Sequence, residues 1–168
     1  MRAATRALIV GAALWVAAIV AAPAALDSAH PVMSSCAAAL YAAGSYVCHQ
    51  RPERSFHIAG RKMPVCARCT GLYVSAAVTA PLAMLFAIPL GSRRARFVLA
   101  LAALPTALTW GLEYAGLMPF GNLVRALAAL PLGAAAAWLV MGAMATADRQ
   151  TLGHDVVSER EAVGRGAM

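Results

Sequence analysis

Residues 123–145 read LVRALAALPLGAAAAWLVMGAMA, and they decide the class of the fold. The stretch carries a single charge, Arg125, and its length matches the roughly 20 residues that a helix needs to cross a hydrocarbon core of about 30 Å. Backbone groups cannot stay unpaired in lipid, which excludes an irregular segment of this length. The stretch therefore predicts a transmembrane helix.

Three further apolar blocks repeat this pattern, near residues 8–25, 70–90 and 97–117. The composition agrees, because 61% of the 168 residues are hydrophobic and only 12% are charged. A soluble domain carries about a quarter of its residues charged. We therefore predict an all-α integral membrane bundle of about four transmembrane helices, with the lipid bilayer as its main partner.

Three regions follow from this pattern. Residues 1–25 form the first transmembrane helix, residues 26–147 form the membrane domain, and residues 148–168 form a polar tail that we expect to be mobile. The first region has a second interpretation, because Arg2 and Arg6 precede an apolar core and small residues, as in a secretory signal peptide. Both interpretations place the following segment on the same side of the membrane.

The net charge of +7 does not indicate nucleic-acid binding. The arginines lie in short runs between apolar blocks, and no basic stripe interleaved with aromatic residues appears.

Arg93, Arg94 and Arg96 crowd one short loop, which favours a cytoplasmic loop and both termini in the cytoplasm. The segment 26–69 then lies outside, although its own basic residues nearly balance this bias. A second copy or another membrane protein is left open as a partner.

The long segment 26–69 between the first two transmembrane helices holds all four cysteines. A connection of this length usually has a function of its own. Cys66 and Cys69 form a Cys-x-x-Cys motif where the second transmembrane helix begins, so their sulfurs share one helix face. The helix N-terminus and the adjacent Arg68 both favour the ionised thiolate.

Upstream, Cys48 and His49 supply a third thiol and an imidazole. Two pairs of soft ligands on separate arms can close on a tetrahedral ion, so we predict a metal site made by Cys48, His49, Cys66 and Cys69. Zinc is the expected ion, with copper as the alternative because thiolates also select Cu(I). Cys36, in an alanine-rich run, is interpreted as a small apolar residue.

A family resemblance rests on these same residues. Residues 48–56 read CHQRPERSF, Gly60 follows, and residues 64–73 read PVCARCTGLY. This pattern resembles a prokaryotic family of predicted membrane proteins catalogued as domain of unknown function 2085, and the likeness continues more loosely to Gly133. The resemblance implies a location in the prokaryotic inner (plasma) membrane, and it implies no particular activity.

Two charges lie within the apolar blocks, Glu113 in the third and Arg125 in the fourth. Charges at such depth are costly and usually paired. Both fall near the short loop 118–122, on the side of the cysteine segment, so we expect them to pair beneath the cysteines. Two interpretations stay open: a salt bridge that locks the helices, or a role for Glu113 as a proton acceptor or outer-shell partner of a metal-bound His49.

Two other functions remain as alternatives, and whether the protein is an enzyme stays open. In a membrane thiol–disulfide oxidoreductase, Cys66 and Cys69 would exchange electrons with a quinone while Cys36 and Cys48 pass disulfides onward. That interpretation has an architectural likeness to vitamin K epoxide reductase and to bacterial disulfide-forming membrane enzymes. In a non-catalytic membrane subunit, the cysteines would form structural disulfides.

Overall fold

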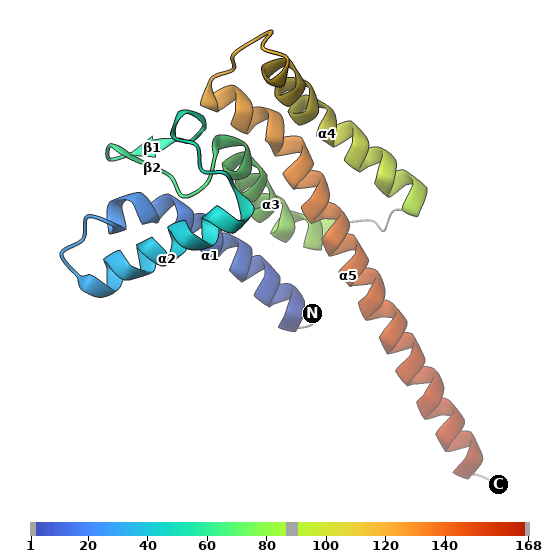
Figure 1. The fold of residues 1–168 in the computed structure, drawn as a ribbon. Coiled ribbons are helices and arrows are strands. Elements are labelled where there is room, and N and C mark those ends of the chain that lie inside the picture. Colours follow the sequence, from blue (N-terminus) through green and yellow to red (C-terminus); the bar gives the residue numbers. More distant parts are fainter. Residues whose placement is uncertain (1–2, 87–90, 167–168) are drawn as a thin grey trace.

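The computed structural model describes residues 3–86 and 91–166, with side chains described through Ala147. This part of the chain is almost entirely helical (Figure 1). Its helices are α1 (Ala3–Ala25), α2 (Pro31–Val47), α3 (Ala67–Phe86), α4 (Ser92–Tyr114) and α5 (Asn122–Gly166). A short 3-10 turn at Pro52–Arg54 precedes a hairpin of two strands, β1 (His57–Ile58) and β2 (Arg61–Lys62).

Four of these helices are long and apolar enough to cross a membrane. They are α1, α3, α4 and residues Asn122–Ala147 of α5. The prediction of an all-α membrane bundle with about four spanning helices is therefore confirmed. Figure 1 shows α3, α4 and α5 alternating in direction, so the start of α3, the end of α4 and the start of α5 lie together near the hairpin.

The tightest helix pair is α3 with α5, because glycines let the two backbones touch. A Cβ atom added to Gly71 of α3 would lie 2.2 Å from the carbonyl oxygen of Ala126 on α5. One added to Gly133 of α5 would lie 2.3 Å from the carbonyl oxygen of Leu72. Small residues at such positions are how membrane helices pack closely, since lipid gives no hydrophobic driving force between them.

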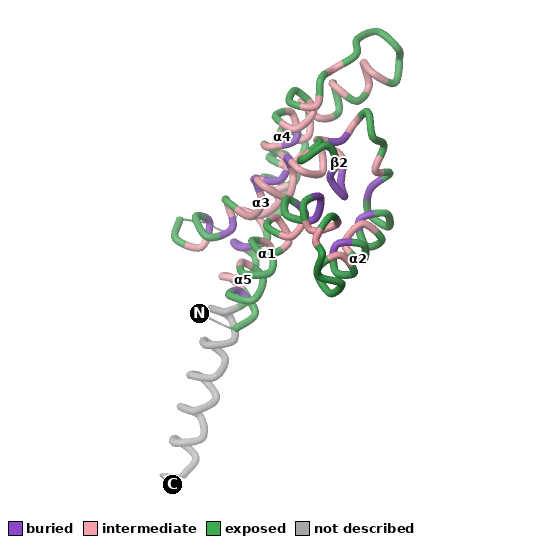
Figure 2. The backbone as a smooth tube through the Cα atoms, turned by 90° about the vertical axis from the view of Figure 1, so that its left-hand side faces the viewer, coloured by how far each residue is buried: buried purple, intermediate pink, exposed green. Residues whose placement is uncertain are grey.

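The fourth helix, α4, is attached much more loosely. Taken as whole residues, none of its residues is buried within the protein, and Figure 2 shows it in the colours of exposed and half-buried residues. Midway along the helix, the Thr106 hydroxyl donates a hydrogen bond of 2.8 Å to the carbonyl oxygen of Ala128 on α5. The polar contacts at its C-terminal end therefore matter for its position.

The segment 26–69 is more ordered than its polar composition suggests. Its alanine-rich run forms α2, which begins with Pro31 at the first helical position, where the missing N–H costs nothing. The hairpin follows, with His57 paired to Lys62 and a turn at Ala59 and Gly60, both with positive φ. A two-residue turn with that backbone matches the twist of the strands.

Some helix boundaries differ from the predicted ones. The second predicted block, 70–90, corresponds to α3, and its last four residues lie outside the described residues. The third, 97–117, corresponds to α4, which begins at Ser92 and ends at Tyr114. The fourth, 123–145, lies within α5, whose backbone stays helical to Gly166, across most of the segment 148–168 that was predicted as a tail.

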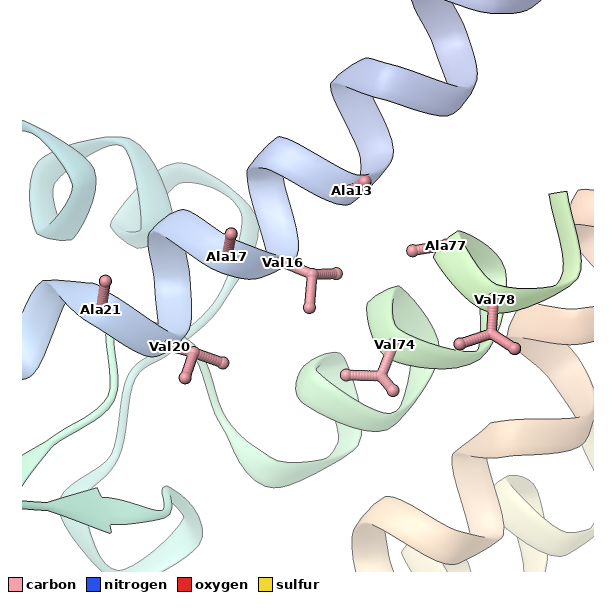
Figure 3. A pocket seen from close by; sticks show the side chains of 8 residues that line it. All are labelled: Ala13, Val16, Ala17, Val20, Ala21, Val74, Ala77 and Val78. Carbon is pink, nitrogen blue, oxygen red and sulfur yellow. The ribbon is translucent and has the colours of Figure 1, made fainter. Parts of the chain in front are cut away.

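Between α1 and α3 lies an open groove of about 520 Å³ (Figure 3). Its lining is entirely alanine and valine: Ala13, Val16, Ala17, Val20, Ala21, Val74, Ala77 and Val78. Because none of these side chains can titrate or bind an ion, this groove offers no chemistry of its own. The reactive groups of the described chain gather instead at the cysteines.

A candidate metal centre at the start of α3

Three cysteines from two arms of the chain meet at the start of α3. Cys48 follows the last residue of α2, Cys66 directly precedes α3, and Cys69 lies in its first turn. Their three sulfur atoms all lie within 4.8 Å of one another. The backbone N–H of Cys66 also donates to the Cys48 sulfur at 3.1 Å. We call residues 48–55 the first arm and residues 63–69 the second arm of this three-thiol cluster.

Hydrogen bonds and one close approach hold the two arms together. A Cβ atom on Gly44 of α2 would lie 2.4 Å from the carbonyl oxygen of Pro64, so α2 rests directly on the second arm. The Tyr41 hydroxyl donates to the carbonyl oxygen of Lys62, and the Lys62 ammonium donates to the carbonyl oxygen of Gln50 at 2.8 Å. These contacts fix the distance between Cys48 and the Cys-x-x-Cys motif.

Apolar side chains surround the cluster. Ile19 of α1, Met63 and Val65 are each at most 2% exposed, and they form one buried core with Cys48. Cys66 and Cys69, half-buried, pack against this core. Burying ionised thiolates in such surroundings is unfavourable unless a positive charge compensates them. Thiolates at this place therefore need a nearby positive charge.

The Cys66 thiol, which lies just before α3, ionises more readily than an ordinary cysteine thiol. Its pKa is lowered to about 5, mainly because the Cys69 thiol donates a hydrogen bond to the thiolate, while burial opposes the shift. The backbone N–H groups of Cys69 and Arg68 and the Cys48 thiol add to the stabilisation. The free N–H groups in the first turn of a helix thus supply part of the effect.

This lowered pKa predicts an unusual alkylation profile for the metal-free protein. A free cysteine with a pKa near 8.5 gains about 80-fold in thiolate between pH 6 and pH 8. Cys66, with a pKa of about 5, is already ionised at pH 6, so its rate of alkylation by iodoacetamide should change less than about threefold over that range. Mass spectrometry of the labelled peptide measures this rate. A rise of about 80-fold, as for a free cysteine, would contradict the lowered pKa of Cys66.

His49, which the sequence placed in the ligand set, does not join the three sulfurs. Its side chain is exposed, and the potential ligand atoms that cluster within 4.8 Å belong to the three cysteines. The reason is local, because the backbone at Cys48 is extended, with φ −149° and ψ 138°. Successive side chains of an extended chain point to opposite sides, so Cys48 points inward and His49 outward.

Cys36 lies apart from the cluster. It is exposed on α2, and Cys48 lies twelve positions further along, directly after the last residue of that helix. At 1.5 Å per residue this is about 18 Å, whereas a disulfide needs Cα atoms within about 7 Å. A disulfide between Cys36 and Cys48, as the redox relay requires, is incompatible with an intact α2.

A charged network lies beside the cluster at the same end of the bundle. Arg125 Nε of α5 lies 2.7 Å from Glu113 Oε1 of α4, so the two residues that the sequence paired are in contact. Arg68 of α3 lies 2.7 Å from the other carboxylate oxygen. The side chains of Arg68, Arg125 and Glu113 are only 13%, 11% and 5% exposed. One carboxylate thus joins three helices.

Two residues at this end of the bundle make contacts that the sequence did not indicate. Arg68 was assigned to the neighbouring thiols, yet residues adjacent in a helix point about 100° apart, so Arg68 cannot share the face of Cys69. That geometry was available from the sequence. Asn122, whose amide donates to the carbonyl oxygen of Ser55 at 2.9 Å, gave no signal, because the contact joins residues 67 positions apart.

Comparison with known proteins agrees with this architecture. Residues 48–139 match the family described as "Predicted membrane protein (DUF2085)". An uncharacterized protein of Methanothermobacter thermautotrophicus is 37% identical over 89 residues, which cover 52% of this chain and 78% of the relative. Another, from Methanocaldococcus jannaschii, is 59% identical over 39 residues, which cover 23% of this chain and 25% of the relative. No solved structure matches the chain.

Proposed function

The chain belongs to the DUF2085 family of predicted membrane proteins, and from its three-thiol cluster we propose that it holds a metal ion of the zinc type at one face of the bilayer. Cys48, Cys66 and Cys69 are the proposed ligands. The observation that carries the proposal is the approach of three sulfurs, from two arms 18 residues apart, to within 4.8 Å of one another.

The spacing of the sulfurs suits a bound ion. Zinc binds thiolate sulfur at about 2.3 Å, so ligand sulfurs around it lie about 3.8 Å apart. Sulfurs that already lie within 4.8 Å need to close by only about 1 Å. The lowered pKa of Cys66 supplies one ligand that is ionised before the ion arrives, and the apolar core around the cluster favours charge compensation.

The donor set narrows the choice of ion. Three thiolates suit zinc or Cu(I) and are poor ligands for magnesium or calcium, which prefer oxygen. With His49 directed outward, the three sulfurs leave a fourth zinc position that no side chain of the described residues is placed to fill. Three protein ligands with one open position is a pattern that zinc sites use.

The direct test is the metal content of the detergent-purified protein, measured by elemental analysis. We expect about one zinc or copper per chain in the wild type and less than a tenth of that in the variant Cys66→Ser/Cys69→Ser. Cys36→Ser is the matched control, because it makes the same chemical change at an exposed thiol outside the cluster. The proposal would be refuted if the wild-type protein contained no metal as purified and took up none when zinc was added.

A second variant tests the place of His49. Because the imidazole is exposed and points away from the three sulfurs, His49→Ala should change the zinc dissociation constant by less than about twofold. His57→Ala, which removes an exposed imidazole from the hairpin, is the control. A tenfold weakening confined to His49→Ala would instead return His49 to the ligand set that the sequence predicted.

The thiol–disulfide alternative keeps one supporting observation. Cys66 has a lowered pKa beside a second thiol in a Cys-x-x-Cys motif, which is the arrangement of a reactive dithiol. The separation of Cys36 from Cys48 removes the second pair of the relay, so this function would need a different onward acceptor. We therefore place it second.

A further inference from the structure

We infer that the Arg68–Glu113–Arg125 network positions the three thiols for the metal ion, by tying both arms of the cluster to the junction of α4 and α5. The inference rests on the proposed metal site and adds three positioning residues, none of which is among the proposed ligands. It also gives the loosely attached α4 a defined role, since its last turn carries the carboxylate that joins the arms.

The second arm is tied through Arg68. This residue lies between Cys66 and Cys69, and its guanidinium donates to Glu113 Oε2 at 2.7 Å. Both side chains are largely buried, so the ion pair is poorly screened by water. Because Arg68 sits in the first turn of α3, this bond fixes the rotation of the turn that carries the Cys-x-x-Cys motif.

The first arm is tied through Arg125. Its Nε donates to Glu113 Oε1 at 2.7 Å, and its Nη1 donates to the carbonyl oxygen of Glu53 at 3.2 Å. Asn122 accepts from the same Nη1 at 2.7 Å and donates to the carbonyl oxygen of Ser55 at 2.9 Å. Two carbonyl groups of the first arm, a few residues after Cys48, are therefore held by α5.

The net charge of the network also favours metal binding at the three-thiol cluster. Two guanidiniums and one carboxylate sum to one positive charge, whereas three thiolates and a divalent ion sum to one negative charge. Opposite charges near one another in surroundings of low polarity attract strongly. The network therefore stabilises the loaded cluster as well as shaping it, in the way that outer-shell groups tune metal sites.

The test uses the full chain in detergent, with Zn²⁺ affinity from chelator competition and the absorption spectrum of the Co²⁺-loaded protein. Glu113→Gln should weaken zinc binding about 10- to 100-fold and alter the Co²⁺ bands. Thr106→Val is the matched control, because it also removes a contact between α4 and α5 but touches neither arm. It should leave affinity within about twofold and the spectrum unchanged.

Arg68→Lys is a second, milder variant that keeps the test valid if Glu113→Gln does not fold. It keeps the positive charge beside Glu113 and removes Nε, a buried donor with no hydrogen-bond partner in the described part of the chain. We expect it to fold and to bind zinc with an affinity between those of Glu113→Gln and wild type. If the wild type binds zinc and both network variants match it in affinity and spectrum, the inference is wrong while the metal site stands.

Discussion

Gly71→Leu is expected to separate α3 from α5 and to leave little folded protein. Even the first atom of the new side chain would lie 2.2 Å from the carbonyl oxygen of Ala126, a backbone atom that cannot move without its helix. Overpacking a well-packed core costs about 1–3 kcal/mol and occasionally more, and a clash between two backbones belongs at the upper end. The thermal unfolding midpoint and the monodisperse yield in detergent measure the loss.

Gly11→Leu is the matched control for that substitution. Gly11 lies in α1, another spanning helix, and a Cβ atom added there meets nothing within 4 Å. Its effect on stability should stay within about 0.5 kcal/mol, as for other substitutions on an open surface. Equal losses from the two variants would mean that a leucine in a spanning helix is harmful in itself, and that the α3–α5 contact is not what Gly71 protects.

The spanning helices could be predicted from the sequence because the membrane imposes a simple rule on length and polarity. Each predicted apolar block overlaps one spanning helix of the structure, and the family likeness around Cys48 and Cys66 is confirmed. The boundaries were less predictable. The block that begins at Phe97 sits in a helix that starts at Ser92, because charged residues such as Arg93 can continue a helix beyond the hydrocarbon core.

The site was only partly predictable, because a sequence shows spacing along the chain and hides direction in space. The Cys-x-x-Cys motif and Cys48 are indeed brought together, since helix periodicity aligns the first pair and the hairpin between them turns the chain back. His49 was grouped with Cys48 because the two are adjacent, yet adjacency in an extended chain separates side chains. Contacts such as Asn122 with Ser55 depend on the finished packing, and no local pattern encodes them.

Glu113→Leu is expected to destabilise the protein by about 3–5 kcal/mol. The substitution leaves the guanidiniums of Arg68 and Arg125 buried without the carboxylate that joins them, and an uncompensated buried charge costs about that much. Denaturant unfolding in detergent, followed by tryptophan fluorescence, measures the change. A loss below about 1 kcal/mol would mean that water reaches the guanidiniums and that the network does little to hold the helices.

The triple variant Arg68→Leu/Glu113→Leu/Arg125→Leu separates stability from function. Replacing a whole buried ion network with apolar residues is often neutral or stabilising, because no charge is left to desolvate. The triple variant should therefore recover more than half of the stability that Glu113→Leu loses. It should not recover zinc affinity, because the ties from Glu113 to both arms of the cluster are gone. A stable triple variant with wild-type affinity would show that the network serves the bundle alone.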